Sequence, residues 1–204
     1  MVRDIALVKY IVAISGASGS VYGIRLIREL LIREQEVHII VSEPARLVIK
    51  HELGWDLSGS LEGVLRSKLP SGHMYFYDNQ NIAAPLASGS FISRAMIVMP
   101  CSMACLSGIA TGNARNLIER AADVMLKERR KLILVPRETP LHSVHLRNML
   151  TLSELGAHLI PAMPAFYHHP RTLEDIIAFM VGKVMDALNI EHNIYQRYQY
   201  EEEQ

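Results

Sequence analysis

Short apolar runs rich in β-branched residues alternate with amphipathic stretches along almost the whole chain, and this alternation strongly restricts the fold. The runs are residues 10–15, 36–41, 95–99, 132–135 and 157–160. Each run is short and apolar on both sides, which is typical of strands in a parallel sheet with both faces covered. Helical patterns separate the runs, so the sequence predicts an α/β fold in which a parallel sheet carries helices on both faces.

The length and composition of the chain favour one domain. The chain has 204 residues and is 50% hydrophobic, which is enough for a single sizeable core. We expect this domain to span residues 1–190 and a C-terminal tail to span residues 191–204 as an arm, either free or docked on a neighbour. Residues 55–81 are predicted to be an irregular excursion within the domain, with a strand-like piece at residues 74–77.

The balance of charge bears on the partners of the protein. Lys plus Arg and Asp plus Glu both number 21, so no net field attracts nucleic acid or an anionic membrane. The sequence has neither a run long enough to span a bilayer nor the pattern of a signal peptide. Cys101 and Cys105 are too few for a disulfide framework or a metal site. We expect a cytoplasmic protein with neither nucleic-acid nor membrane partners.

Two opposed charges, Arg137 and Glu138, follow the apolar run at residues 132–135. Pro136 has no N–H to donate to a sheet, so it should stop the strand and leave both charges on the following loop. In open α/β sheets ligands bind outside the carboxyl ends of the strands, which makes this pair a candidate site. The alternative is a solvated surface pair, and position alone does not decide between the two.

A glycine-rich segment, SGASGS, joins the first apolar run to a helical pattern. Such a junction directs backbone N–H groups and the positive end of a helix dipole at one place, which suits a phosphate. Gly16, Ala17 and Ser18 have small side chains that leave room for a flat ring or a phosphate. The glycines do not have the spacing of a dinucleotide fingerprint, so NAD is weakly supported. A tight turn without a ligand is the alternative.

Other polar residues also follow predicted strands. Ser42 follows the second run, and the small residues from Cys101 to Ala104 follow Pro100, which is expected to end the strand at residues 95–99. We interpret this loop as an anion cradle that continues into a helix, because no His follows it in the pattern of a nucleophilic triad. Arg120 and Lys127 share one helix face, where a solvated pair or a phosphate site is possible.

Three prolines predict an extended loop in the segment PAMPAFYHHP, which holds Tyr167 after the last predicted strand. The adjacent histidines that follow point in different directions on an extended chain, so a zinc site is rejected. Thr172 is expected to cap a helix that carries Lys183 and runs to about Leu188, with Asp175 at its third position.

Taken together, four segments closely resemble the flavin prenyltransferase family of the UbiX type: ISGASGSVYG, the PCS loop, RAADVMLKERRKLILVPRETPLHSVHLRNM and MPAFYHHP. The resemblance covers nearly the whole chain. It implies a flavodoxin-like Rossmann fold and a homo-oligomer, usually a dodecamer, with sites at subunit junctions. The implied activity joins a dimethylallyl group from dimethylallyl phosphate to reduced FMN without a metal. The prenylated FMN product serves a UbiD-type decarboxylase.

The resemblance also implies roles for individual residues. FMN binding is implied for Gly16, Ala17, Ser18, Ser42, Cys101, Ser102, Met103, Ala104 and Arg137. Binding of the dimethylallyl phosphate is implied for Tyr167, Lys183, Arg120 and Lys127. The implied catalytic residues, which relay protons, are Ser18, Glu52 and Glu138, with Glu52 a contributor from a neighbouring chain. This set suits the chemistry, because cations and a hydroxyl on the leaving phosphate replace a metal.

The sequence departs from the family pattern at three positions. Many relatives have Lys in place of Ala104, and some have Trp in place of Ile82 and Tyr198, but we expect the activity to survive. One alternative is an FMN-dependent cysteine-type decarboxylase of the same fold, whose Asn-containing loop and Met-Asn motif do not occur here. A second alternative is a non-catalytic flavin carrier.

Overall fold

The computed structural model describes residues 7–57 and 59–198, and the strands in this part of the chain form one parallel six-stranded sheet. The strands are β1 (Lys9–Ile14), β2 (Glu36–Val41), β3 (Met74–Asp78), β4 (Ala95–Cys101), β5 (Lys131–Pro136) and β6 (His158–Leu159). Their order is β3-β2-β1-β4-β5-β6, which is a Rossmann order. Without the edge strand β3 it is the flavodoxin order, so the predicted fold class is confirmed.

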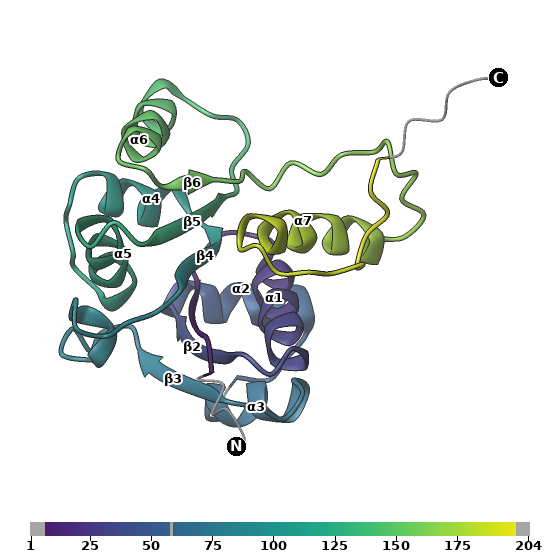
Figure 1. Ribbon diagram of the computed structural model, residues 1–204, viewed down its shortest axis with the longest axis horizontal. Coiled ribbons are helices and arrows are strands. Elements are labelled where there is room, and N and C mark those ends of the chain that lie inside the picture. Colours follow the sequence, from purple (N-terminus) through teal and green to yellow (C-terminus); the bar gives the residue numbers. More distant parts are fainter. Residues whose placement is uncertain (1–6, 58, 199–204) are drawn as a thin grey trace, which may run out of the picture.

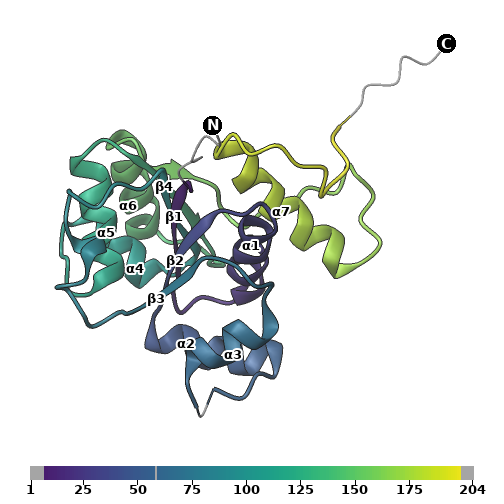
Figure 2. The same ribbon diagram turned by 60° about the horizontal axis from the view of Figure 1, so that its bottom comes forward.

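Helices cover both faces of this sheet. They are α1 (Ser20–Ile32), α2 (Glu43–Leu53), α3 (Leu61–Lys68), α4 (Met103–Ala110), α5 (Leu117–Lys127), α6 (Ser143–Glu154) and α7 (Leu173–Ala187), with a short 3₁₀ helix at Pro85–Ala87. Residues of α1, α2, α3 and α7 pack on one face, and residues of α4, α5 and α6 pack on the other. Figure 2 shows the two groups on opposite sides of the sheet.

The two cores follow from the alternation of side chains along the strands. In β1, Val12 and Ile14 belong to the core under α1 and α7, whereas Ile11 and Ala13 belong to the core under α4 and α5. Successive residues of a strand point to opposite faces, so a strand that is apolar throughout can serve both cores. The chain leaves β1 toward β2 on one side and returns to β4 on the other, which places the switch point of the sheet between β1 and β4 (Figure 1).

The end of β4 differs from the sequence prediction. Pro100 is expected to end that strand at Met99, but β4 continues to Cys101. The register against β5 shifts between Val98 and Cys101, which lets the chain accommodate a residue without an N–H donor. The carbonyl of Pro100 accepts hydrogen bonds from the backbone N–H of Ser15 (3.2 Å) and from its hydroxyl (2.9 Å). β4 is therefore tied to the end of β1.

Two helix predictions also need correction. Residues 55–81 are predicted to be irregular apart from one strand, but α3 forms there, capped by the side chain of Ser60, which accepts from the N–H of Gly63 at 3.3 Å. Leu65 is the buried residue of α3, so its apolar period is too weak to recognise. The segment after Ser102 is predicted as a loop leading into one helix. It folds as two helices, α4 and α5, with Gly112 between them at a φ of +66°.

The prediction for α7 is confirmed. Thr172 accepts from the N–H of Asp175, and the Asp175 carboxylate accepts from the N–H of Thr172, which completes the capping box. The described part of the predicted tail packs on α7 of its own chain, and residues 199–204 of that tail lie outside the described residues. The domain boundary at residue 190 stays a prediction. In the described part of the chain, no helix has the length and apolar character that crossing a membrane requires.

Candidate functional site

A pocket of about 390 Å³ lies at the carboxyl ends of β1, β2 and β4, beside the switch point of the sheet. Its size is within the range of small-molecule and cofactor sites. Four of the expected FMN-binding residues line it: Gly16, Ser42, Ser102 and Ala104. The sheet brings them together because parallel strands end at one edge, although more than eighty residues separate the first from the last.

Three helices begin at this pocket. Ser42, Ser102 and Asn116 line it and cap α2, α4 and α5, and each side-chain oxygen accepts a backbone N–H three residues on, at 3.2, 3.3 and 3.0 Å. The remaining N–H groups of each first turn and the helix dipoles favour an anion there. The pocket can therefore bind a phosphate. Asn116 was not predicted, because its position beside Ser42 and Ser102 depends on the packing of α5.

Ser15 is a further residue that the sequence did not single out. It is 3% exposed, donates its hydroxyl to the carbonyl of Pro100 at 2.9 Å, and accepts from the N–H of Ser102 at 2.7 Å. One side chain thus holds the loop after β1 against the loop after β4. Its signal in the sequence is weak: a serine at the end of an apolar run.

Gly16 is required by a close approach between two segments. A Cβ built at this residue would lie 2.4 Å from the Cβ of Pro44, in the first turn of α2. Any side chain at residue 16 would push α2 away from the loop after β1. Because Gly16 and Pro44 both line the pocket, this would also change the shape of the pocket.

Glu52 lies beside the loop after β1. Its carboxylate accepts from the N–H groups of Gly19 (2.9 Å) and Ser20 (2.9 Å) and from the hydroxyl of Ser20 (2.8 Å). Burial would raise the pKa of Glu52, but hydrogen bonds from Ser18, Gly19 and Ser20 outweigh burial and lower the pKa. These donors belong to the same chain as Glu52, so the carboxylate reaches Ser18 without a second molecule. Its expected contribution from a neighbouring chain stays a prediction.

Arg137 and Glu138 lie on the loop after β5, as the sequence predicts. The backbone N–H of Arg137 donates to the carbonyl of Cys101 at 3.2 Å, which joins this loop to the end of β4. The Glu138 carboxylate is half-buried and accepts from the N–H of Thr139 at 3.0 Å. Burial raises the pKa of Tyr22 above its ordinary value, although the nearby guanidinium of Arg137 acts in the opposite direction. The structure thus adds Tyr22 as a neighbour of Arg137.

The cysteines behave as core residues. Cys101 and Cys105 are both buried and free. A hydrogen bond with Cys105 and burial together raise the pKa of the Cys101 thiol well above its ordinary value. A thiol in this state is a poor nucleophile. Met103 is also buried, and Ala104, where many relatives have Lys, faces the pocket.

Arg120 and Lys127, expected at the prenyl phosphate, are not at this pocket. They lie on α5, where the guanidinium of Arg120 donates to the carbonyl of Ala87 at 3.2 Å and to Asp123 at 2.7 Å. The Lys127 ammonium is 3.4 Å from the carboxylate of Glu128. Both cations are partly exposed and are available to an anion that approaches from outside the chain.

Tyr167 and Lys183 lie on the other side of the sheet. Tyr167 is 45% exposed, and its ring meets those of Phe179 (6.0 Å between centroids) and Tyr198 (5.5 Å) edge to face. The Lys183 ammonium is 4.0 Å from the Asp186 carboxylate. The carbonyl of Ala187, one helical turn after Lys183, accepts from the side chain of Lys131, the first residue of β5. Lys183 therefore lies toward the edge of the sheet where the strands begin.

The single chain thus brings four of the expected FMN-binding residues to one pocket but does not bring the expected phosphate residues together. Arg120 and Lys127 belong to the face covered by α5, and Lys183 belongs to the face covered by α7. The sheet separates the two groups. The sequence could not reveal this separation, because it depends on which face of the sheet each helix covers.

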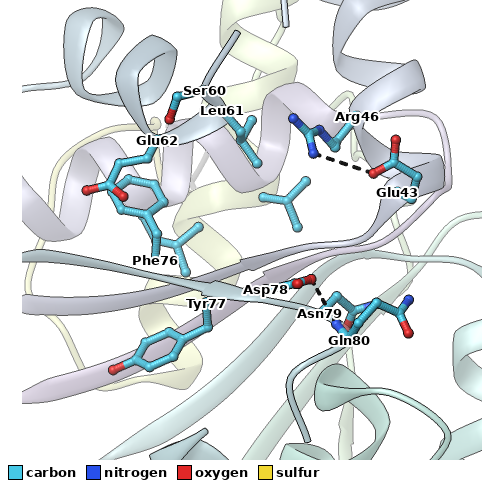
Figure 3. Close-up of a pocket in the computed structure, with 12 residues that line it drawn as sticks. Glu43, Arg46, Ser60, Leu61, Glu62, Phe76, Tyr77, Asp78, Asn79 and Gln80 are labelled. Carbon is cyan, nitrogen blue, oxygen red and sulfur yellow. Dashed lines mark hydrogen bonds and ion pairs between the residues drawn. The ribbon is translucent and has the colours of Figure 1, made fainter. Parts of the chain in front are cut away.

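A second pocket of about 400 Å³ lies between β2, β3, α2 and α3 (Figure 3). Of the described residues that line it, none is an expected site residue. Figure 3 shows Arg46 paired with Glu43, and the carboxylates of Glu62 and Asp78 also line this pocket. Three carboxylates beside one guanidinium do not favour a phosphate. Glu43 and Glu119 also line the pocket at the switch point, but three capped helix N-termini meet there, so it is the better candidate. Within the described chain, no group of three or more His, Cys, Asp and Glu residues could hold a metal ion.

Comparisons with known proteins identify relatives of this chain. The sequence profile of the Flavoprotein family matches residues 3–185. The flavin prenyltransferase UbiX of Alkalihalophilus pseudofirmus is 51% identical over 189 residues, which cover 92% of this chain and 94% of that protein. The crystal structure of AnUbiX with FMN and dimethylallyl pyrophosphate has a TM-score of 0.88 and 38% identity, over 96% of this chain and 100% of that one. A dodecameric FMN-dependent UbiX-like decarboxylase from Escherichia coli O157:H7 has a TM-score of 0.86 and 40% identity, over 94% and 100%.

Proposed function

The chain belongs to the Flavoprotein family and, within it, to the flavin prenyltransferases of the UbiX type, and we propose that it prenylates reduced FMN. The dimethylallyl group of dimethylallyl phosphate is transferred to the flavin, and phosphate leaves. The observation that carries this proposal is the pocket at the switch point, which unites Gly16, Ser42, Ser102 and Ala104 next to the loop of Arg137 and Glu138.

The residues of the pocket fit FMN. The capped N-termini at Ser42 and Ser102 can bind its phosphate through backbone N–H groups. Ala104 lines the pocket with a small side chain that leaves room for a flat ring, and Gly16 lets Pro44 approach closely, which sets the shape of the pocket. The guanidinium of Arg137, on the adjoining loop, can donate to the flavin. When bound, the reduced flavin supplies the nucleophilic ring atoms of the reaction.

Ser18, Glu52 and Glu138 are proposed to move protons during the transfer. Glu52 keeps its charge, because its pKa is lowered by the donors around it, so it can orient the Ser18 hydroxyl as a proton carrier. Glu138 is half-buried on the loop after β5 and has one fixed hydrogen bond, which leaves its second oxygen free for a proton. Glu52 thus belongs to α2 and Glu138 to the loop after β5, so the two carboxylates come from different elements.

Departure of the phosphate is proposed to need Tyr167, Lys183, Arg120 and Lys127. Three cations and a hydroxyl stabilise the charge that develops on the leaving oxygens. The two faces of the sheet keep Lys183 from Arg120 and Lys127 within one chain. We therefore propose that a second copy of the chain completes each site, in a homo-oligomer with sites at its subunit junctions. A dodecamer is the proposed size, as in the relative from E. coli. The product would serve a UbiD-type decarboxylase.

The proposal is tested by anaerobic incubation of the purified protein with reduced FMN. Dimethylallyl phosphate and dimethylallyl diphosphate are supplied in separate reactions, because the relative AnUbiX was crystallised with the diphosphate. Mass spectrometry of the released flavin should show a gain of one isoprene unit with at least one donor. An unchanged flavin mass with both donors contradicts the proposal.

A decarboxylase activity is the second candidate, because the structure from E. coli O157:H7 is described as an FMN-dependent decarboxylase. The protein loaded with oxidised FMN is incubated with a peptide that ends in cysteine, and release of carbon dioxide is measured. We expect none. Carbon dioxide release without flavin prenylation would favour this candidate.

A further inference from the structure

Residues 189–198, here called the C-terminal strap, turn back along α7 in the opposite direction (Figure 1). The contact is close at Gly182 of α7. A Cβ built there would lie 2.2 Å from a ring carbon of Tyr195 and 3.0 Å from a ring carbon of His192. His192 is 7% exposed, and its Nε2 lies 3.0 Å from the carbonyl oxygen of Gly182. Only glycine at residue 182 permits this packing.

Asp186 is the polar centre of the contact between the strap and α7. Its Oδ1 is 3.1 Å from Nε2 of His192 and accepts from the guanidinium of Arg197 at 2.7 Å. Its Oδ2 accepts from the hydroxyl of Tyr195 at 2.7 Å and lies 4.0 Å from the ammonium of Lys183. A single carboxylate therefore binds three residues of the strap and approaches one candidate phosphate ligand.

The ionisation of this group agrees with its geometry. Burial would raise the pKa of Asp186, but hydrogen bonds from Arg197 and Tyr195 outweigh burial and lower it. Burial and the hydrogen bond to Asp186 together raise the pKa of Tyr195 to about 12. Near neutral pH the carboxylate is charged and the phenol keeps its proton, so the contact between them persists.

The strap also arranges the aromatic side chains around Tyr167. The ring of Tyr195 meets Phe179 at 5.2 Å, and Phe179 meets Tyr167 at 6.0 Å. Tyr198, the last residue of the described strap, meets Tyr167 edge to face, with 5.5 Å between the ring centroids. The position of Tyr167 therefore depends on the strap being in place.

We propose that Asp186 is a positioning residue that holds the C-terminal strap on α7 and thereby holds Tyr167 and Lys183 in the arrangement that receives the prenyl phosphate. This inference rests on the proposed function and names a determinant of its second substrate. If the strap leaves α7, Asp186 loses its three strap partners and keeps Lys183 alone. The ammonium is then neutralised by Asp186, and a phosphate must compete for it.

The test measures the binding of dimethylallyl phosphate to protein loaded with oxidised FMN by calorimetry, so that it does not depend on turnover. Gly182→Ala should detach the strap, and Tyr195→Phe should loosen it by removing one hydrogen bond to a charged acceptor. We expect the Kd for dimethylallyl phosphate to rise about tenfold or more in each variant. Glu62→Gln, which removes an exposed ion pair with Arg66 on α3, is the matched control and should leave this Kd unchanged.

A double variant separates positioning from general damage. Adding Asp186→Asn to Gly182→Ala removes the carboxylate that captures Lys183 once the strap has left. We expect part of the lost affinity to return, whereas a merely structural role of Asp186 would make the double variant bind more weakly still. A weaker double variant overturns the proposal.

Hydrogen exchange of the strap amides and the Kd for FMN complete the experiment. We expect faster exchange in residues 189–198 of Gly182→Ala and Tyr195→Phe, with an unchanged Kd for FMN, because no residue of the described strap lines the flavin pocket of its own chain. Faster exchange with unchanged binding of dimethylallyl phosphate overturns the inference, and so does unchanged exchange in both variants.

If Gly182→Ala does not fold, the measurements on Tyr195→Phe decide. If wild-type protein binds dimethylallyl phosphate but forms no product, the proposed function fails while these comparisons still decide the role of Asp186.

Discussion

Ser15 has a buried hydroxyl that serves two strand ends at once. It donates to the carbonyl of Pro100 and accepts from the N–H of Ser102, so its loss leaves both groups unpaired in a buried place. At the scale of single residues, the flavin pocket depends on such short polar side chains. They set the distance between loops that carry little apolar surface.

Ser15→Ala tests this dependence. We expect the free energy of unfolding to fall by about 1–3 kcal/mol and the affinity for FMN to fall with it, because two buried polar groups lose their partner. Chemical denaturation and flavin fluorescence measure the two effects. Ser67→Ala removes an exposed hydroxyl that donates to a carbonyl within α3, and it should change neither quantity. Equal behaviour of the two variants would contradict the role of Ser15.

Glu138→Gln separates catalysis from flavin binding. The amide keeps the shape of the side chain but cannot take up a proton, so we expect prenyl transfer to slow by about a hundredfold or more while the Kd for FMN stays the same. Single-turnover assays with flavin mass spectrometry measure the rate. Glu154→Gln, at the exposed end of α6, is the control. If Glu138→Gln behaves like wild type in both assays, the alternative of a non-catalytic flavin carrier is favoured.

Glu52 should make stability depend on pH. Its pKa in the folded protein is below the ordinary value of 4.5, so its stabilising contribution is present above that value and is lost as the pH falls through the folded-state pKa. Glu52→Gln should therefore lose less stability than wild type between about pH 6 and about pH 3. Denaturant titrations at several pH values measure this. Parallel curves for the two proteins would show that the hydrogen bonds of Glu52 do not persist in solution.

Helix α1 packs on β1 and β4 with very little space, and this packing belongs to the scale of elements. A Cβ built at Gly23 would lie 2.2 Å from the carbonyl oxygen of Met99 and 3.0 Å from the side chain of Ile14. The helix therefore approaches the sheet backbone directly. This close approach also holds the N-terminus of α1 at the loop that carries Ser18.

Gly23→Ala and Gly63→Ala should change stability in opposite directions. At Gly23 the added methyl must displace α1, which we expect to cost about 1–3 kcal/mol of the free energy of unfolding. At Gly63 on α3 the nearest atom to a built Cβ is 3.7 Å away, so the higher helix propensity of Ala should raise stability by up to about 1 kcal/mol. Thermal or chemical denaturation decides, and a stabilised Gly23→Ala variant would contradict the close packing of α1.

The elements themselves could largely be predicted from local patterns. The strand at residues 36–41 and the cap of α7 at Thr172 match the structure, because apolar runs and capping residues act over short distances. The extension of β4 past Pro100 and the helix α3 could not be predicted. The end of β4 depends on Ser15, just after the neighbouring strand β1, and α3 is held by the burial of Leu65 under other elements.

At the scale of the whole molecule, the sheet divides the expected phosphate residues between its two faces. Lys127 is on α5 and Lys183 is on α7, and these helices pack on opposite faces. A phosphate can meet both cations only if they come from different chains. The oligomer is therefore proposed to be part of the active site.

Mixing two inactive variants tests this. Lys127→Ala and Lys183→Ala should each lose most of the prenyl transfer, since each removes a cation from the leaving phosphate. After dissociation and reassembly of an equal mixture, about a quarter of the sites should combine an intact Lys127 with an intact Lys183 from different chains, and activity should return to about that level. Native mass spectrometry must confirm mixed oligomers. If mixed oligomers form but no activity returns, the proposal that each site takes Lys127 and Lys183 from different chains is contradicted.

The sequence by itself determined the parallel α/β fold and the loops that carry chemistry, because the apolar period of a strand and the residues at its carboxyl end are local properties of the chain. The tertiary structure alone decided which of those loops meet. Ser15, Asn116 and Tyr22 joined the site through contacts between distant segments, and Lys183 was separated from Lys127 by the face on which each helix packs. Packing of helices on a sheet depends on the burial of many residues at once, so no single motif of the sequence records it.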